Sequence, residues 1–350
     1  MASDFAGLGA VPEHLAFDVD GLRAGVGDAV PGMSGAIEVK KFKGGQSNPT
    51  YLITTGEGRY VLRRKPPGKL LGSAHQVGRE ARVMHALADT AVPVPKVLFH
   101  TEDPDMIGSE FFIMEHLDGR IFWNPQVPDL APEDRRTLYH NLTDVLAALH
   151  GVEFDAVGLG DFGPRTDYIT RQVGRWSKQY KASETQKVEA MDWLIDWLPR
   201  NIPAGDQTCL IHGDFRLDNC IMANQAPEPI GLIDWELSTL GHPLADLTYF
   251  LMAWQIPLSP GGGPSLVGED LEAMGIPREK ELIDRYRETT GADVPEDLSF
   301  YFAYNLFRLA GIVQGVAKRA IDGNASSEKA ASYGAMVAPL ADLARKFADN

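Results

Sequence analysis

The spacing of apolar residues changes along the chain from the period of strands to the period of helices. Between residues 35 and 115 the apolar runs are short and are separated by turn residues, as in a sheet. Two of them flank Gly56-Glu57-Gly58, which predicts a β-hairpin. The expected strands are Ile37–Phe42, Thr50–Thr55, Arg59–Arg64, Lys96–Phe99 and Phe111–Glu115, and the expected helix among them is Ser73–Ala88.

Helical periodicity dominates beyond Asp118-Gly119. In Arg135–His150, leucine and valine recur at three- and four-residue spacing on one face, which predicts an amphipathic helix. Two short strand-like runs, Cys209–Ile211 and Ile230–Ile233, interrupt the helical part, and the further expected helices are 167–181, 184–198 and much of the chain after Pro243.

This pattern predicts an α+β fold with a small β-rich lobe followed by a larger, mostly helical lobe. We expect three segments: an N-terminal arm with a short helix (1–34), the β-rich lobe (35–117) and the helical lobe (118–350). A length of 350 residues is sufficient for two lobes.

Composition and charge favour a folded globular protein over a membrane-spanning or nucleic-acid-binding one. Hydrophobic residues make up 44% and charged residues 23%, as in folded globular proteins, and no apolar run is long enough to span a membrane. The N-terminus does not resemble a signal peptide, and the two cysteines lack metal-ligand spacing, so we expect a reducing, cytoplasmic setting. A net charge of −15 argues against nucleic acid as a partner, although one local basic site can still hold a nucleotide.

The strongest chemical signal is the segment His212-Gly213-Asp214-Phe215-Arg216-Leu217-Asp218-Asn219. A histidine two residues before an aspartate, with an asparagine five residues further on, is the pattern of a kinase catalytic loop. Phosphoryl transfer needs a carboxylate that orients the attacking hydroxyl and oxygen ligands that hold Mg²⁺ on the phosphates. Asp214 fits the first role and Asn219 the second. Asp234 follows the buried run Ile230–Ile233, where a kinase places its other metal carboxylate.

These motifs resemble the aminoglycoside phosphotransferase and choline kinase superfamily, a branch of the protein-kinase-like fold. The resemblance rests on Leu210–Asn219 and Ile233–Glu236 and extends from about residue 35 to about residue 320. Within the superfamily, Gly45–Tyr51 and Tyr60–Gly68 are similar to the kinase-like domain that is fused to some acyl-CoA dehydrogenases. The resemblance implies a two-lobed kinase-like fold, ATP and Mg²⁺ as cofactors, and a small-molecule hydroxyl as acceptor.

The resemblance also assigns a nucleotide site in the β-rich lobe. It places Arg63 where a kinase has its phosphate-contacting lysine, with Arg64 or Lys65 as alternatives, and Glu80 as the helix partner of that cation. Strand alternation favours Arg63 or Lys65 over Arg64. The residues implied to cover the phosphates are Gly44, Gly45, Ser47 and Asn48, and those implied to bind adenine are Glu115, through its carbonyl, and Leu117, through its N–H.

Three further features belong to the helical lobe. We assign Arg216 to charge stabilisation of the transferred phosphate, and Asp246 to structural support of the catalytic loop. The basic and aromatic stretch Arg171–Tyr180 is interpreted as a solvated helix with Trp176 in the core, the alternative being a site for an anionic acceptor.

The sequence therefore predicts an ATP- and Mg²⁺-dependent phosphotransferase that acts on a small molecule. The alternative is a non-catalytic nucleotide-binding regulatory module, which an arginine at the lysine position would suit. A two-metal hydrolase would need further His and Asp clusters, and a protein kinase would need an activation loop after Asp234. The acceptor stays open: the subgroup suggests a hydroxy acid or a hydroxyacyl-CoA, and an aminoglycoside or a choline-like molecule remains possible.

Overall fold

The computed structural model describes residues 7–43, 48–67, 76–257, 264–322 and 333–349. Gly44, Gly45 and Ser47, which are predicted to cover the phosphates, and Ser73, the expected start of a helix, lie outside the described residues. The chain forms two compact units. The first contains the residues up to Trp123 together with Asp218–Ser238, and the second contains Asn124–Leu217 and Thr239–Asn350. The segment boundaries expected at residues 34 and 117 stay a prediction.

The first unit is built on a six-stranded antiparallel sheet with the strand order β1-β2-β3-β4-β6-β5. The hairpin expected around Gly56-Glu57-Gly58 is present, with Thr54 opposite Arg59. The strands are β1 (Leu8–Gly9), β2 (Glu38–Phe42), β3 (Thr50–Thr54), β4 (Arg59–Arg64), β5 (Val97–Thr101) and β6 (Phe111–Glu115).

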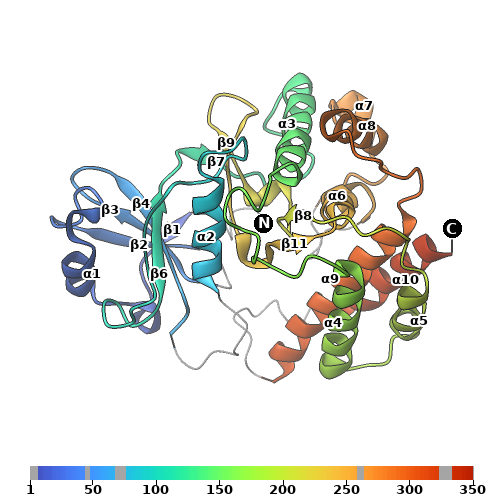
Figure 1. Cartoon of the computed structure of the whole chain (residues 1–350), viewed down its shortest axis with the longest axis horizontal. Coiled ribbons are helices and arrows are strands. Elements are labelled where there is room, and N and C mark those ends of the chain that lie inside the picture. Colours follow the sequence, from blue (N-terminus) through green and yellow to red (C-terminus); the bar gives the residue numbers. More distant parts are fainter. Residues whose placement is uncertain (1–6, 44–47, 68–75, 258–263, 323–332, 350) are drawn as a thin grey trace. The chain divides into compact units, whose positions relative to one another are not determined.

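One helix covers each face of this sheet (Figure 1). Helix α1 (Val19–Val26) begins at Asp18, whose carboxylate accepts a hydrogen bond from the Asp20 amide, and it buries Leu22 and Val26 against one face. Helix α2 (Val77–Leu87) packs against β5 and β6. Because side chains alternate along a strand, β4 contributes Leu62 to the core under α1 and Arg63 to the opposite face.

A second, three-stranded sheet in the first unit has the order β10-β9-β7. The strands are β7 (Gly119–Arg120), β9 (Cys220–Ala223) and β10 (Pro229–Leu232). The expected strand at Ile230–Ile233 is β10, shifted by one residue, and its partner β9 was not expected from the sequence. A short 3-10 helix precedes β9 (η5, Leu217–Asn219) and another follows β10 (η6, Trp235–Leu237).

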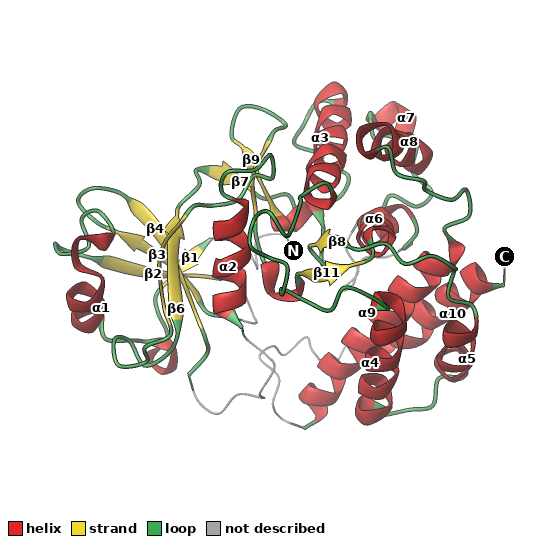
Figure 2. Cartoon of the chain, viewed as in Figure 1, coloured by secondary structure: helices red, strands yellow, loops and turns green. Residues whose placement is uncertain are grey.

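The second unit is mostly helical, as Figure 2 shows. Its longest helix, α9, is buried along most of its length and packs against α4, α6 and α10, whereas α3 packs against α8. A two-stranded ladder joins β8 to β11. The elements are α3 (Pro132–His150), α4 (Tyr168–Ser183), α5 (Glu189–Trp197), β8 (Cys209–Ile211), β11 (Thr239–Gly241), α6 (Pro243–Leu251), α7 (Leu271–Met274), α8 (Glu279–Thr290), α9 (Ser299–Ile321) and α10 (Val337–Ala348). The predicted α+β class, with a β-rich and a helical part, is confirmed.

Candidate active site

Arg63 is the centre of a buried charge network in the first unit. Its Nε atom lies 2.9 Å from Oε2 of Glu80 on α2, and its Nη2 atom lies 2.5 Å from Oδ1 of Asp234. Arg63 is 8% exposed and Glu80 is 1% exposed, so neither side chain is solvated. The predicted pair between the β4 cation and the α2 glutamate is therefore present.

Two polar side chains complete the network around this pair. The Asn48 amide, which is fully buried, donates to Glu80 Oε1 over 3.0 Å. Arg63 Nη1 donates to the Thr50 hydroxyl over 3.4 Å. Glu80 is thereby held by Arg63 and by Asn48.

The alternatives to Arg63 make other contacts. Arg64 lies on the opposite face of β4, where its guanidinium stacks over the Phe17 ring at 5.6 Å and donates to the Ser109 hydroxyl over 3.0 Å. Lys65 forms an ion pair with Glu110. Arg63 is therefore the basic residue of this stretch that reaches Glu80 and Asp234.

The network carries more negative than positive charge. Burial raises the pKa of Glu80 to about 7; Arg63 opposes this shift, and the carboxylates of Asp234 and Glu236 add to it. Burial by itself lowers the pKa of Arg63. The carboxylates of Glu80, Asp234 and Glu236 outweigh this effect and hold the pKa of Arg63 above its usual value. One guanidinium thus faces three carboxyl groups, an imbalance that a bound cation would offset.

Asn219 and Asp234 lie at the same end of the β9–β10 ladder. Cys220 pairs with Leu232, and the Ile233 amide donates to the Asn219 carbonyl over 2.9 Å. Asp234 is thus one residue beyond the position opposite Asn219. Asp234 also adopts a left-handed backbone (φ 69°, ψ 55°), a conformation that is uncommon for residues other than glycine, asparagine and aspartate. This unexpected β9 strand is what brings the two predicted metal ligands together.

Asp246 organises the catalytic loop in the second unit. Its carboxylate accepts hydrogen bonds from the backbone amides of His212, over 2.6 Å, and Gly213, over 2.8 Å. Burial by itself raises the pKa of Asp246, but the hydrogen bonds and charges from His150 and His212 outweigh it and lower the pKa. The structural role predicted for Asp246 is confirmed by these contacts.

Gly213, which provides the second of these amides, adopts a backbone conformation that suits glycine, with φ at 80°. Asp214 follows it, and the Asp214 amide donates to Nδ1 of His212 over 3.2 Å. His212 therefore stabilises the conformation of this loop. Arg216 Nε lies 3.5 Å from Asp214 Oδ1, with the Arg216 side chain about half exposed.

Sequence reasoning missed two residues that touch this loop. Arg308 on α9 donates through Nη2 to the Gly213 carbonyl over 2.5 Å, and Tyr249 on α6 is hydrogen-bonded to the Asp214 carboxylate. Arg308 is the only charged residue in the largely apolar run Phe300–Ala310, a signal that could have identified it.

The predicted adenine-binding segment begins at Glu115, the last residue of β6. Glu115 pairs with Tyr60 at the end of the β4–β6 ladder, and its side chain accepts a hydrogen bond from the Lys96 amide over 2.8 Å. Leu117 packs against Gly231, where a larger residue would collide with the Leu117 side chain. The backbone roles predicted for Glu115 and Leu117 stay predictions.

Trp176 is buried at 5% exposure, which agrees with the interpretation of the stretch Arg171–Tyr180 as a helix with Trp176 in the core. Among the described residues no group of three or more His, Cys, Asp or Glu side chains could hold a metal ion, and no helix there is long and apolar enough to cross a membrane. A magnesium site does not require such a cluster, because Mg²⁺ is commonly held by one or two protein ligands together with phosphates.

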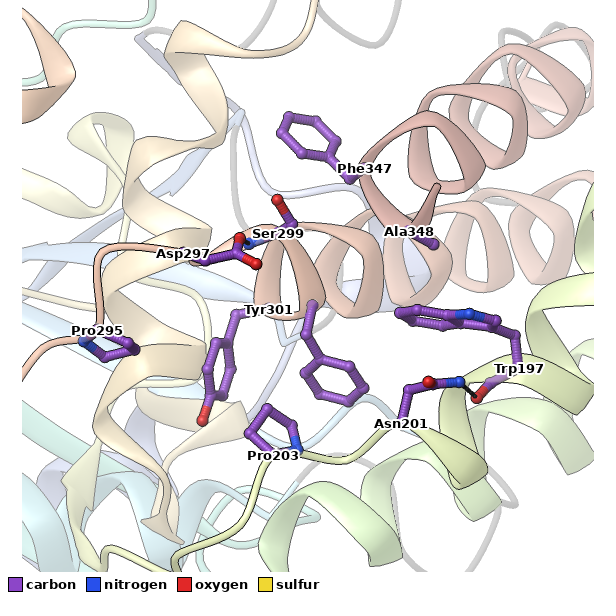
Figure 3. A pocket seen from close by; sticks show the side chains of 10 residues that line it. Trp197, Asn201, Pro203, Pro295, Asp297, Ser299, Tyr301, Phe347 and Ala348 are labelled. Carbon is purple, nitrogen blue, oxygen red and sulfur yellow. Dashed lines mark hydrogen bonds between the residues drawn. The ribbon is translucent and has the colours of Figure 1, made fainter. Parts of the chain in front are cut away.

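A surface cavity of about 360 Å³ lies in the second unit (Figure 3), and none of the predicted site residues lines it. Four of its ten lining residues are aromatic. Two of its polar side chains form local hydrogen bonds: Asn201 donates to the Trp197 carbonyl, and Asp297 accepts from the Ser299 amide, both over 2.8 Å. The cavity thus contains none of the groups that we assign to phosphoryl transfer. It is lined by Trp197, Asn201, Pro203, Pro295, Asp297, Ser299, Phe300, Tyr301, Phe347 and Ala348.

Comparison with known proteins supports the family and the fold. The model of the phosphotransferase enzyme family matches residues 38–282. A Ralstonia eutropha protein, whose crystal structure is described as that of a "putative aminoglycoside phosphotransferase", is 42% identical with a TM-score of 0.86, covering 95% of this chain and 99% of that one. The fold also matches aminoglycoside phosphotransferase APH(4)-Ia in complex with ADP and hygromycin B, at 16% identity and a TM-score of 0.59, covering 89% of this chain and 94% of that one.

Longer proteins contain a similar segment. Acyl-CoA dehydrogenase family member 10 of Mus musculus is 44% identical over 90% of this chain, and member 11 of Rattus norvegicus is 40% identical over 95%. The chain spans only 30% of the mouse protein and 43% of the rat protein.

Proposed function

Because this chain belongs to the phosphotransferase enzyme family, we propose that it transfers the γ-phosphoryl group of ATP to a hydroxyl of a small molecule, with Mg²⁺ as cofactor. One observation supports this proposal above the others. Asn219 and Asp234 lie at one end of the β9–β10 ladder, and Asp234 contacts Arg63, which pairs with Glu80. Two oxygen ligands beside a buried phosphate-binding cation are what phosphoryl transfer needs.

In this proposal the first unit binds the nucleotide. Arg63, held by Glu80, contacts the phosphates, and Asn48 covers them together with Gly44, Gly45 and Ser47. The Glu115 carbonyl and the Leu117 amide bind adenine. Asn219 and Asp234 would hold Mg²⁺, which offsets charge on the phosphate oxygens when bound. The excess of carboxylates around Arg63 fits a cation at this place.

Asp214 is the proposed catalytic residue of the second unit. Its carboxylate orients the acceptor hydroxyl and takes its proton as the bond to phosphorus forms. Arg216, 3.5 Å from that carboxylate, offsets the charge of the transferred phosphoryl group. The free, buried thiols of Cys209 and Cys220 fit the reducing cytoplasm that we propose as the setting.

The names of the relatives support candidate acceptor classes. The longer proteins are named as acyl-CoA dehydrogenases, which supports a hydroxy acid or a hydroxyacyl-CoA as the acceptor. The proteins named as aminoglycoside phosphotransferases support an aminoglycoside as the rival, and a choline-like alcohol is a further one.

One contact favours the alternative of a non-catalytic nucleotide-binding module. Arg63 pairs with Asp234 as well as with Glu80, so a proposed metal ligand is already engaged by a cation. A regulator could keep this pair when nucleotide binds, whereas a kinase must share Asp234 with the metal.

A coupled assay of ADP release decides between the two functions. We would incubate the chain with Mg²⁺ and ATP and add hydroxy acids, hydroxyacyl-CoAs, aminoglycosides and choline one at a time. We expect turnover that depends on one of these classes and that Asp214→Asn abolishes without weakening ATP binding. Tight ATP binding without acceptor-dependent turnover would favour the regulatory module, and equal turnover by Asp214→Asn would contradict the role of Asp214.

A further inference from the structure

Arg308 is a buried charge in the middle of α9. The residue is 4% exposed, and its neighbours along the helix, such as Phe307 and Ala310, are apolar and buried. Burying a charge is unfavourable unless hydrogen bonds or other polar contacts compensate it. Packing alone does not explain an arginine at this position.

The guanidinium is instead held by the catalytic loop and two aromatic rings. It donates to the Gly213 carbonyl over 2.5 Å and lies 4.9 Å from the ring centre of Tyr249 and 5.7 Å from that of Trp176. Charge-assisted hydrogen bonds and cation–π contacts are strongest when they are shielded from water. Burial lowers the pKa of Arg308, but the surrounding tyrosines and the Asp214 carboxylate outweigh it, so the side chain stays charged.

Tyr249 provides a second connection from Arg308 to the loop. The Arg308 guanidinium lies over the Tyr249 ring, and the Tyr249 hydroxyl is hydrogen-bonded to the Asp214 carboxylate. Tyr249 lies three residues after Asp246, on the same face of α6, and Asp246 binds the amides of His212 and Gly213. The loop is thus fixed at its amides by α6 and at the Gly213 carbonyl by α9.

We propose that Arg308 is a positioning residue for phosphoryl transfer, which fixes the Gly213–Asp214 peptide and the Tyr249 ring and thereby sets the direction of the Asp214 carboxylate. The proposal rests on the function assigned to Asp214. A small displacement of a group that must align a hydroxyl with a phosphate lowers the rate of chemistry more than the affinity for the nucleotide. Arg308 should therefore affect kcat rather than the KM for ATP.

Steady-state kinetics with the acceptor found in the ADP-release panel test this role. We expect Arg308→Met to lower kcat at least tenfold with the KM for ATP changed less than twofold. Arg308→Lys, which keeps the charge and one donor for Gly213, should restore part of kcat, and Tyr249→Phe, which keeps the ring, should lower kcat about threefold. Arg319→Met, an exposed change on the same helix, serves as the control. A KM that rises as much as kcat falls, or no difference between the Lys and Met variants, would overturn the proposal.

A double-mutant cycle tests the same link without any acceptor. Urea unfolding is measured for the full chain, for Arg308→Met, for Asp214→Asn and for the double variant. If Arg308 and Asp214 are coupled through Gly213 and Tyr249, the unfolding constant of the double variant should differ at least threefold from the value expected when the effects of the two single variants are independent. Additivity within a factor of two, the agreement expected for independent sites, would refute the link. If Arg308→Met does not fold, Arg308→Lys replaces it in the cycle.

The kinetic assay and the unfolding cycle together distinguish a failure of the proposed function from a failure of the role assigned to Arg308. A wild-type chain with no turnover on any acceptor counts against the proposed function, and the unfolding cycle still decides the role of Arg308. A wild-type chain that turns over, with Arg308→Met as active as Arg319→Met, counts against Arg308 alone.

Discussion

Arg63 and Asp234 form an ion pair of 2.5 Å although 171 positions separate them in the sequence. The contact requires that β10 returns the chain to the unit that contains β4 and α2. The Arg63 guanidinium thereby contacts both Asp234 and Glu80. The proposed function assigns these carboxylates different roles, since Asp234 would hold Mg²⁺ and Glu80 holds Arg63. Two properties of Arg63 can be tested separately: how much its ion pairs stabilise the fold, and whether one side chain must bridge both carboxylates.

Arg63→Met should lower the free energy of unfolding by about 3 kcal/mol, because it leaves Glu80 buried without its cation. Arg63→Lys should recover only part of this loss, since an ammonium group is a point charge and cannot bridge Glu80 and Asp234 as a planar fork does. Urea unfolding of the three chains measures both effects. Arg64→Met, a change on the opposite face of β4, is the comparison, and a Lys variant as stable as wild type would contradict the bridging geometry.

Glu80→Gln should make stability less dependent on pH. The pKa of Glu80 is raised to about 7 in the folded chain from a reference of 4.5, so its contribution to stability is fully present below pH 4.5 and is lost as the pH rises through about 7. The loss is at most about 3 kcal/mol, because each pKa unit corresponds to about 1.4 kcal/mol.

Glutamine mimics the neutral acid at every pH. The free energy of unfolding of wild type relative to Glu80→Gln should therefore decrease between pH 4.5 and pH 8. Urea titrations at four pH values measure it, with Glu133→Gln as the exposed control on α3. A difference that grows with pH would mean that Arg63 outweighs the burial of Glu80.

The sequence predicted most of the elements that carry the site, because they depend on local patterns. The hairpin β3–β4 follows from apolar alternation around Gly56-Glu57-Gly58, and α3 follows from helical spacing. The pair between Arg63 and Glu80 came from a family resemblance, since nothing local to β4 or α2 specifies it.

Long-range pairing accounts for what was missed. Strand β9, Cys220–Ala223, is too short to show a period, and it becomes a strand only through its ladder with β10 and β7. Arg308 lies in a helix whose apolar surroundings predict core, and its contact with Gly213 depends on how α9 packs within its unit. Tertiary context of this kind is absent from a single sequence.

Asp246→Ala should destabilise the chain by about 3 kcal/mol, because two buried amides, of His212 and Gly213, lose their acceptor. Asp246→Asn retains one oxygen and should recover about half of this loss. The pKa of Asp246 is lowered in the folded chain, so its stabilisation is present above the unfolded pKa and is lost as the pH falls through the folded value. Acid unfolding of Asp246→Asn should therefore be shallower than that of wild type, and identical acid titrations would argue against an ionised Asp246.

Arg216→Ala should lower turnover about a hundredfold and change ATP affinity less than threefold, because its assigned role is to offset charge that develops during transfer. The side chain is about half exposed, so stability should remain near that of wild type. Kinetics of ADP release together with ATP titration separate the two quantities. An equal loss of turnover and affinity would place Arg216 in ground-state binding.

Asp234→Asn should weaken Mg²⁺-dependent ATP binding at least tenfold while the chain stays folded. Asparagine tolerates the left-handed backbone at this position, so the substitution removes the charge and keeps the conformation. Asp234→Ala removes the charge as well but should be less stable by about 1 kcal/mol, since a left-handed alanine is strained. Calorimetric titration of ATP with and without Mg²⁺ measures the loss of metal-dependent ATP affinity. Urea unfolding measures the loss of stability that is caused by backbone strain. If Asn and wild type bind ATP equally well with Mg²⁺, Asp234 is not a metal ligand, and its contact with Arg63 serves only the fold.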